Sequence, residues 1–248
     1  MVKEIQYRTG KMTKPTSQMS PSELKKWEEQ SKKDIRNYLF SINQPLVYYL
    51  EGVPVAEYKD GRIEKLRWIY IIAGPPGIGK SSSSYSYVPD GVPIIDQDLA
   101  AYQYKKEGFH DYQQLATFGI NQKIKNHLFE KKDFVLELNL GFQSHYDYLK
   151  SIAYFDSSNK IHLILYFTDD IELCLLRAES RHRNGGHLVE PAIIEEMFEN
   201  TFPLFKENVK LFKTIKFLDV SDTSIIEVTS NHIPNWIKDN DLSQYLIS

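Results

Sequence analysis

The chain has 248 residues, of which 42% are hydrophobic, and its formal net charge is -3. This length suits one sizeable α/β domain with an appendage, and the charge argues against nucleic acid or an acidic membrane surface as the partner. No apolar run approaches the roughly 20 residues of a membrane span. The single cysteine, Cys174, cannot form an internal disulfide. It therefore predicts a reducing, cytoplasmic setting, and we expect its side chain to fill the core.

Residues 1–66 are predicted to form an N-terminal helix followed by a β-meander. Ser20, Pro21 and Glu23 are typical of a capped helix start. Apolar residues recur near one face of this helix, at Leu24, Trp27, Ile35, Leu39 and Ile42. Short apolar segments follow, and Asp60-Gly61 predicts a hairpin turn between two of them. We expect this section to pack on the domain that follows.

From residue 67 onward, apolar strand patterns alternate with helical patterns. Strands are predicted at 67–73, 92–96, 133–139, 160–168 and 212–220, and helices at 98–106, 112–131, 143–155, 170–184 and 191–209. This alternation indicates an α/β domain over residues 67–248, with a mainly parallel sheet covered by helices on both faces. In such sheets, ligands bind beyond the carboxyl ends of the strands.

The segment after the first of these strands fits the phosphate-loop pattern G-x-x-x-x-G-K-S/T. We expect nine residues to cradle phosphate: Gly74, Pro75, Pro76, Gly77, Ile78, Gly79, Lys80, Ser81 and Ser82. Glycines allow the backbone N–H groups to turn toward phosphate oxygens, and a following helix would add its positive N-terminal end. Lys80 is expected to reach the β- and γ-phosphates, and Ser81 is expected to bind Mg²⁺. The fold is therefore predicted to be of the P-loop NTPase or kinase type.

The phosphate loop alone does not separate kinases, ATPases and GTPases. The guanine-reading pattern N-K-x-D is absent, which argues against a GTPase. Asp169 and Asp170 come nearest to the acidic pair of a remodelling ATPase, but their place between a strand and a helix is more typical of helix capping.

Acidic residues also follow the second and third predicted strands. Asp96 and Asp98 stand where a kinase needs a carboxylate to orient a hydroxyl and accept its proton. We expect one of them to cap the next helix and Asp98 to be the catalytic acid–base group. Glu137 interrupts an apolar strand, so it binds substrate or a metal-bound water unless it faces outward on an edge strand.

Arginines precede a glycine pair near the end of the fourth predicted helix. Arg177 and Arg181 are four residues apart and share a helix face, and Gly185-Gly186 predict the helix end. His187 follows at once. Guanidinium groups bind phosphate oxygens in pairs of hydrogen bonds, so this segment is predicted to be a lid over the transferring phosphate. The alternative is a solvated helix in which Glu172 and Glu179 pair with the arginines.

These motifs together resemble the zeta-toxin-like kinases, in the branch marked by a Gly-Gly-His lid. The resemblance covers about residues 70–222 and depends on four motifs in order: the phosphate loop, Asp96-Gln-Asp98, Glu137-Leu-Asn-Leu140 and the segment from Arg177 to Val189. The chain departs from the family at Leu138 and Asn139, where the family has threonines, and residues 1–66 match nothing in the family core.

The resemblance implies ATP- and Mg²⁺-dependent phosphorylation of a small molecule, with UDP-N-acetylglucosamine as the acceptor in the best-known members. It implies that Asp98 is the base and that Arg177 and Arg181 brace the phosphates. It further implies that Glu137 binds substrate, with Asp96, Asn139 and His187 as candidate substrate contacts. An antitoxin-like protein is an implied partner.

Two other functions are compatible with these residues. One is a nucleotide-binding regulatory or interaction module with weak turnover, which the appended front section and the changed acceptor motif favour. The other is a kinase acting on a nucleic-acid end, which would want a basic channel that this composition does not favour.

Overall fold

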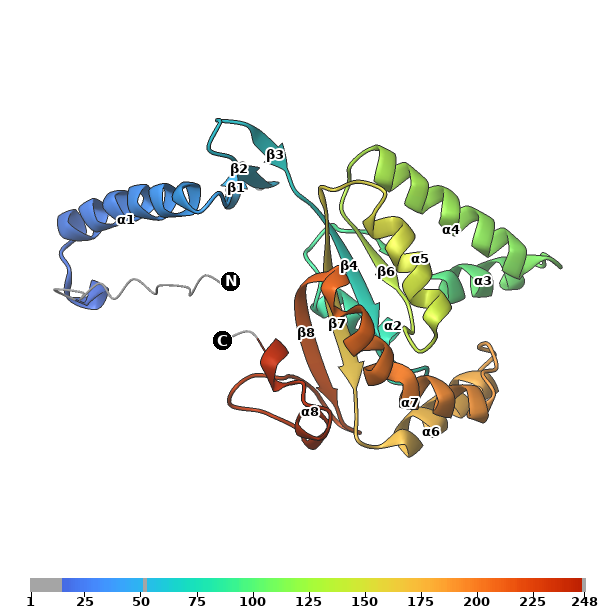
Figure 1. The fold of residues 1–248 in the computed structure, drawn as a ribbon. Helices are drawn as coiled ribbons and strands as arrows, with labels where there is room; N and C mark the ends of the chain where they lie inside the picture. Colours follow the sequence, from blue (N-terminus) through green and yellow to red (C-terminus); the bar gives the residue numbers. More distant parts are fainter. Residues whose placement is uncertain (1–14, 51–52, 247–248) are drawn as a thin grey trace. The chain divides into compact units, whose positions relative to one another are not determined.

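The computed structural model describes residues 15–50 and 53–246. The chain divides into two compact units, Met1–Lys65 and Leu66–Ser248, and Figure 1 labels their elements. Within the described residues, no helix combines the length and the apolar character needed to cross a membrane.

The N-terminal unit contains a long helix and a small antiparallel sheet, as predicted. After a 3-10 turn at Thr16–Gln18, its elements are α1 (Pro21–Ser41), β1 (Leu46–Leu50), β2 (Val53–Glu57) and β3 (Ile63–Lys65). The predicted capping box is present, because Ser20 accepts from the Glu23 N–H while the Glu23 carboxylate accepts from the Ser20 N–H. The chain turns between β2 and β3 at Gly61, whose positive φ of 83° suits glycine.

The C-terminal unit is built on a six-stranded sheet in the order β5-β6-β4-β7-β8-β9. Its strands are β4 (Arg67–Ala73), β5 (Ile94–Ile95), β6 (Phe134–Glu137), β7 (Asn159–Phe167), β8 (Phe212–Val220) and β9 (Ile225–Glu227). Neighbouring strands run parallel except for β9, which is antiparallel to β8. The predicted mainly parallel sheet is confirmed.

Helices cover both faces of this sheet (Figure 1). They are α2 (Lys80–Ser83), α3 (Gln97–Lys106), α4 (Tyr112–Phe129), α5 (Gln143–Ala153), α6 (Ile171–Arg183), α7 (Pro191–Asn208) and α8 (Asn235–Asp239). Alternate strand residues point to opposite faces. Ile71 and its neighbours pack with α4, α5, the second half of α7 and α8, whereas Ile72 and its neighbours pack with α6 and with Ile78 of the phosphate loop.

Four elements differ from the sequence expectation. The helix after the phosphate loop is a single turn, because serine side chains compete for backbone groups: Ser83 Oγ donates to the Gly79 carbonyl. The strand expected at 92–96 is reduced to Ile94–Ile95. The edge strand β9 and the short helix α8 were not predicted. Trp236 anchors α8, with its ring buried and its indole N–H donating to Asp219 Oδ1 at 2.8 Å.

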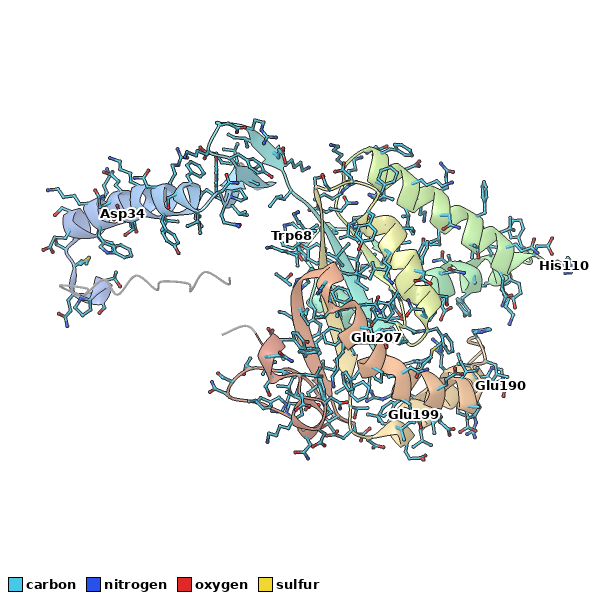
Figure 2. All side chains as sticks on the ribbon, in the orientation of Figure 1. Asp34, Trp68, His110, Glu190, Glu199 and Glu207 are labelled. Carbon is cyan, nitrogen blue, oxygen red and sulfur yellow. The ribbon has the colours of Figure 1, made fainter. Side chains whose placement is uncertain are left out.

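The candidate site residues lie together at the carboxyl ends of the parallel strands. Central strand β4 lies between β6 and β7, and the phosphate loop follows its carboxyl end. Figure 2, which carries the side chains, labels Trp68 near the other end of β4 and Glu190 beside the start of α7. Parallel strands that end at the same edge therefore deliver the phosphate loop, Asp96 and Glu137 to one cleft.

Candidate functional site

The phosphate loop wraps closely against its neighbours. Gly74 and Gly77 have positive φ values of 140° and 82°. A Cβ atom on Gly77 would stand 2.1 Å from the Cys174 carbonyl oxygen, and one on Gly74 would stand 2.5 Å from the Tyr166 carbonyl oxygen. Both positions therefore need glycine for conformation and for space. Cys174 itself is fully buried beneath the loop, as predicted, and burial raises the pKa of its thiol to about 11.

Lys80 lies inside the loop and is only 6% exposed. Its ammonium donates to the Gly74 carbonyl at 2.8 Å, to the Pro75 carbonyl at 3.1 Å and to Asn139 Oδ1 at 2.9 Å. Burial lowers the pKa of Lys80, and the nearby Glu137 carboxylate opposes that shift. Asn139 therefore touches the phosphate-loop lysine, in addition to the substrate contact that the sequence predicts for it.

Ser81 and Glu137 form the pair best suited to a divalent cation. Ser81 Oγ donates to Glu137 Oε1 at 2.8 Å, while Glu137 Oε2 is buried without a hydrogen-bond partner among the described residues. Burial raises the pKa of Glu137, and Lys80 acts in the opposite direction. Strand β6 lies inside the sheet, between β5 and β4, so the outward-facing edge position is excluded. A hydroxyl and a carboxylate are hard oxygen ligands of the kind Mg²⁺ takes, so these residues fit that ion.

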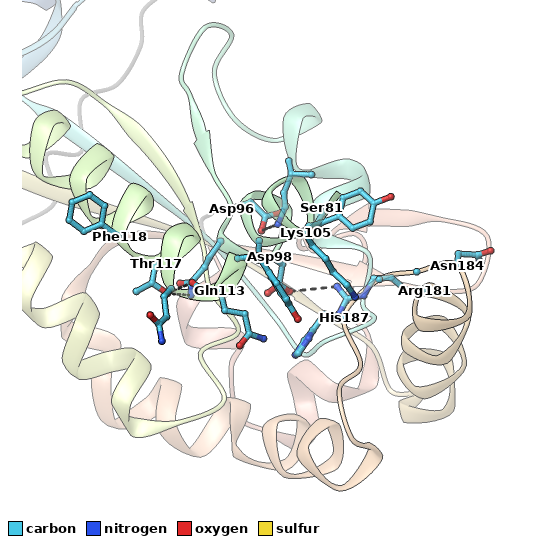
Figure 3. A pocket seen from close by; sticks show the side chains of 18 of the residues that line it. Ser81, Asp96, Asp98, Lys105, Gln113, Thr117, Phe118, Arg181, Asn184 and His187 are labelled. Carbon is cyan, nitrogen blue, oxygen red and sulfur yellow. Dashed lines mark hydrogen bonds and ion pairs between the residues drawn. The ribbon is translucent and has the colours of Figure 1, made fainter. Parts of the chain in front are cut away.

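Asp96 and Asp98 separate into two roles at the start of α3. Asp96 is the N-cap residue, and its carboxylate accepts from the Leu99 N–H at 3.1 Å. Asp98 lies in the first turn, where its Oδ2 is 3.7 Å from Arg181 Nη1. The structure therefore assigns the capping task to Asp96 and leaves the Asp98 carboxylate directed into the cleft, beside a guanidinium (Figure 3).

The end of α6 brings the guanidinium group of Arg181 beside Asp98. Gly185 has a positive φ of 88° and ends the helix, as predicted. A Cβ atom on Gly186 would stand 2.7 Å from Cγ of Arg181, so this glycine leaves room for the arginine. Arg181 Nε is buried without a partner among the described residues. A buried N–H donor without a partner is costly, so it suits an anionic ligand.

Arg177, one turn earlier in α6, binds backbone carbonyl groups of two other segments. Its guanidinium donates to the Ile78 carbonyl at 3.4 Å, to the Ser221 carbonyl at 3.2 Å and to the Asp222 carbonyl at 3.1 Å. It thus ties the phosphate loop to the segment after β8. Asp170 caps α6 by accepting from the Leu173 N–H, as predicted, and Glu179 pairs with Arg183.

Two cavities of about 910 Å³ each lie side by side in this cleft. The first, which we call the donor cavity, contains the phosphate loop, Glu137, Asn139, Arg177 and the segment Ser221–Ile225. The second, the acceptor cavity, is lined by α3, α4 and the turn after α6. Four residues line both cavities: Ser81, Asp98, Arg181 and His187. Figure 3 shows Asp98, Arg181 and His187 together, with Gln113, Thr117 and Phe118 on the other side.

Two groups of residues line the cavities although the sequence did not predict them as site residues. The segment Ser221–Ile225 contributes backbone carbonyls, which no residue-type pattern reveals. The α4 residues of the acceptor cavity were predicted to be helical, but nothing in the pattern placed them in a site. Their polar face, at Gln113, Thr117 and Asn121, was the available signal, since it follows an i, i+4 spacing.

Comparisons with known proteins concern the fold. No protein-family model matches the sequence, and no curated protein matches it significantly. Similar solved structures include one from the PezAT chromosomal toxin-antitoxin system of Streptococcus pneumoniae, with a TM-score of 0.47 at 14% identity over 95% of this chain and 90% of that chain.

Two further solved structures are less similar. A chain of the Pnkp1/Rnl/Hen1 RNA repair complex has a TM-score of 0.45 at 14% identity over 65% of this chain and 48% of that chain. Shikimate kinase from Acinetobacter baumannii has a TM-score of 0.35 at 18% identity over 64% of this chain and 85% of that chain.

Proposed function

We propose that this protein is an ATP-dependent kinase that transfers the γ-phosphoryl group to a hydroxyl group of a small molecule. The observation that carries the proposal is the junction of the two cavities at Ser81, Asp98, Arg181 and His187. One cavity contains a phosphate loop, and the other opens onto a carboxylate that can accept a proton. A phosphoryl group bound at the end of the first lies within reach of a hydroxyl bound in the second.

Three residues of the junction, together with Lys80 of the donor cavity, have separate tasks in the transfer. Asp98 orients the acceptor hydroxyl and takes its proton as the hydroxyl oxygen forms a bond to the γ-phosphorus. The bond between that phosphorus and the β–γ bridging oxygen breaks, which leaves ADP and a phosphate monoester. Arg181 and Lys80 stabilise the negative charge that spreads over the transferring oxygens. His187 lines both cavities and is placed to contact the same phosphoryl group.

Mg²⁺ would be held by Ser81, with Glu137 beside it. When bound, this ion neutralises charge on the β- and γ-phosphate oxygens. Glu137 keeps Ser81 oriented by accepting a hydrogen bond from its hydroxyl group at 2.8 Å. The three hydrogen bonds of Lys80 hold the loop in shape before the nucleotide arrives. As phosphate enters, the Lys80 ammonium group turns to it or shares its hydrogen bonds with it.

UDP-N-acetylglucosamine is the acceptor that the resemblance implies, so it is the reference compound in tests of the acceptor. The chain departs from the family at Leu138 and Asn139, and Asn139 contacts the phosphate-loop lysine, so the acceptor of this chain is open to change. The resemblance also implies an antitoxin-like protein partner, which would be detected as a protein that lowers the rate of ADP formation.

The proposed function is tested by acceptor-dependent ADP release. Purified full-length protein is mixed with ATP and Mg²⁺, with and without a metabolite extract. We expect ADP formation to rise with the extract, and a phosphorylated species to appear in equal amount. Tight ATP binding without any acceptor-dependent ADP would instead favour a nucleotide-binding regulatory module.

A further inference from the structure

The volume and the lining residues of the acceptor cavity indicate the size and the charge of the acceptor, which no sequence motif does. Its volume of about 910 Å³ lies at the upper end of the 300–1,000 Å³ range typical of small-molecule sites, which suits a molecule larger than one simple sugar. Its chemistry divides by element. Among the charged lining residues, Asp98 and Lys105 come from α3 and Arg181 comes from α6, whereas α4 supplies a wall of its own (Figure 3).

The α4 wall is uncharged. The lining side chains of this helix are Tyr112, Gln113, Gln114, Thr117, Phe118 and Asn121. They alternate aromatic rings with amides and a hydroxyl along one helix face. Such a wall matches a ligand that offers a ring face and neutral hydrogen-bonding groups.

The polar side chains of this wall fall into two groups, those already hydrogen-bonded within the protein and those without such a bond. Thr117 and Asn121 are already held, because Gln97 Nε2 donates to Thr117 Oγ1 at 3.0 Å and the Tyr148 hydroxyl donates to Asn121 Oδ1 at 3.2 Å. Within the part of the chain that the structure describes, the side-chain amides of Gln113 and Gln114 make no such bond. Each can therefore donate to and accept from a ligand.

Phe118 adds an apolar face beside these amides. Its side chain is 72% exposed, although it lines a cavity. A ring of the ligand laid against it would remove apolar surface from water, which is favourable.

The charges of the cavity do not suit a polyanion. The cationic side chains lining it are Lys105 and Arg181, and Arg181 is paired with Asp98 and directed at the transfer point. Lys105 Nζ lies 5.7 Å from the centroid of the Tyr112 ring. A diphosphate bound here would meet one available lysine and the carboxylates of Asp96 and Asp98, and like charges in a cavity are costly.

We propose that the acceptor is an uncharged, ring-containing, hydroxylated molecule, comparable in size to a nucleoside or disaccharide, which Gln113, Gln114 and Phe118 recognise. A nucleoside diphosphate sugar does not belong to this class of acceptors, because it is charged. The proposal rests on the proposed kinase function and narrows it to one chemical class of substrate.

The test separates acceptors by charge. A metabolite extract of the source organism is divided by anion exchange at neutral pH into an unretained pool and a retained pool. Each pool is incubated with full-length protein, Mg²⁺ and ATP carrying a heavy-oxygen label on its γ-phosphate. Mass spectrometry then detects label in new phosphate monoesters. Pure UDP-N-acetylglucosamine is tested alongside.

Labelled product from the unretained pool is the expected result. Product from the retained pool alone, or from UDP-N-acetylglucosamine at a higher rate than from the unretained pool, overturns the proposal while kinase function stands. No labelled product from either pool, with ATP still bound, removes the proposed function and this proposal with it.

Variants of α4 link the product to the proposed wall. Gln113→Leu and Phe118→Ala are expected to raise the KM for the active pool about fivefold to tenfold, since each loses one hydrogen bond or one ring contact. Phe129→Ala is the matched control, because Phe129 lies on the same helix, is 73% exposed and does not line the cavity. Equal KM values for the three variants would overturn the assignment of this wall to acceptor recognition.

Discussion

The donor and acceptor cavities are built in opposite ways. In the donor cavity the polar groups are already engaged with one another: Lys80 with loop carbonyls and Asn139, Ser81 with Glu137, and Arg177 with three carbonyls. In the acceptor cavity the α4 wall offers neutral side chains, and the amides of Gln113 and Gln114 have no hydrogen-bond partner among the described residues.

This difference has a physical reason. Every nucleoside triphosphate presents the same phosphate oxygens, so the donor site can be held rigid in advance. An acceptor varies from one enzyme to another and is recognised by a few side chains on one helix. Preorganised donors aimed at developing charge contribute most to transition-state stabilisation, so substitutions on the donor side should cost the most rate.

Lys80→Ala should have the largest effect. The β- and γ-phosphates lose a charged donor held inside the loop, so we expect kcat to fall at least about 10³-fold and ATP to bind more weakly. Steady-state rates and calorimetric ATP binding measure both. Lys216→Ala is the matched control, because Lys216 pairs with Glu227 at 2.9 Å between β8 and β9. Near-normal turnover by Lys80→Ala would remove the kinase proposal.

Arg181→Ala and Arg177→Ala should differ in kind, although the sequence predicts both to be catalytic. Arg181 has a buried Nε without a described partner and stands beside Asp98, so its loss should lower kcat about 10²-fold. Arg177 holds the segment after β8, so its loss should mainly raise the KM for ATP. Equal losses of kcat in both variants would mean that Arg177 also reaches the transferring phosphate.

Asp96→Ala should affect stability rather than chemistry. Removal of the cap of α3 should cost about 1 kcal/mol of unfolding free energy, as measured by chemical denaturation. Asparagine caps as well as aspartate, so Asp96→Asn should keep that stability. A large loss of kcat in Asp96→Asn, with stability unchanged, would assign Asp96 a role in catalysis.

The smallest effect is expected from the N-terminal unit. The sequence predicts that residues 20–66 pack on the domain that follows, and this stays a prediction. If it holds, a chain that starts at residue 66 should show a lower Tm than the full chain while its ATP affinity changes little. An equal Tm for the two would identify residues 20–66 as an independent appendage.

The donor side could be predicted because its chemistry is local in sequence. The strand, the loop glycines, Lys80 and Ser81 are contiguous, and their pattern fixes their arrangement. The division of labour between Asp96 and Asp98 was also accessible, since a residue between a strand and a helix is expected to cap. The strong apolar periods of the sheet and its longer helices located them to within a few residues.

The acceptor side could not be predicted, because it depends on tertiary packing. The period of α4 indicates a helix, but only its packing beside α3 shows that Gln113 and Phe118 line a cavity. The three-residue strand β9 and the five-residue helix α8 are too short to carry a period. The tie from Arg177 to the segment after β8 runs to backbone carbonyls, which residue types do not reveal.

The central claim is that phosphate passes between the two cavities at Asp98. Its most direct test is Asp98→Asn, assayed for ATP affinity and for the rate of phosphate transfer to the active metabolite pool. The account predicts unchanged ATP affinity and a loss of about 10²–10⁴ in kcat, because a neutral amide does not accept the hydroxyl proton. Transfer at the wild-type rate with unchanged ATP binding would contradict it.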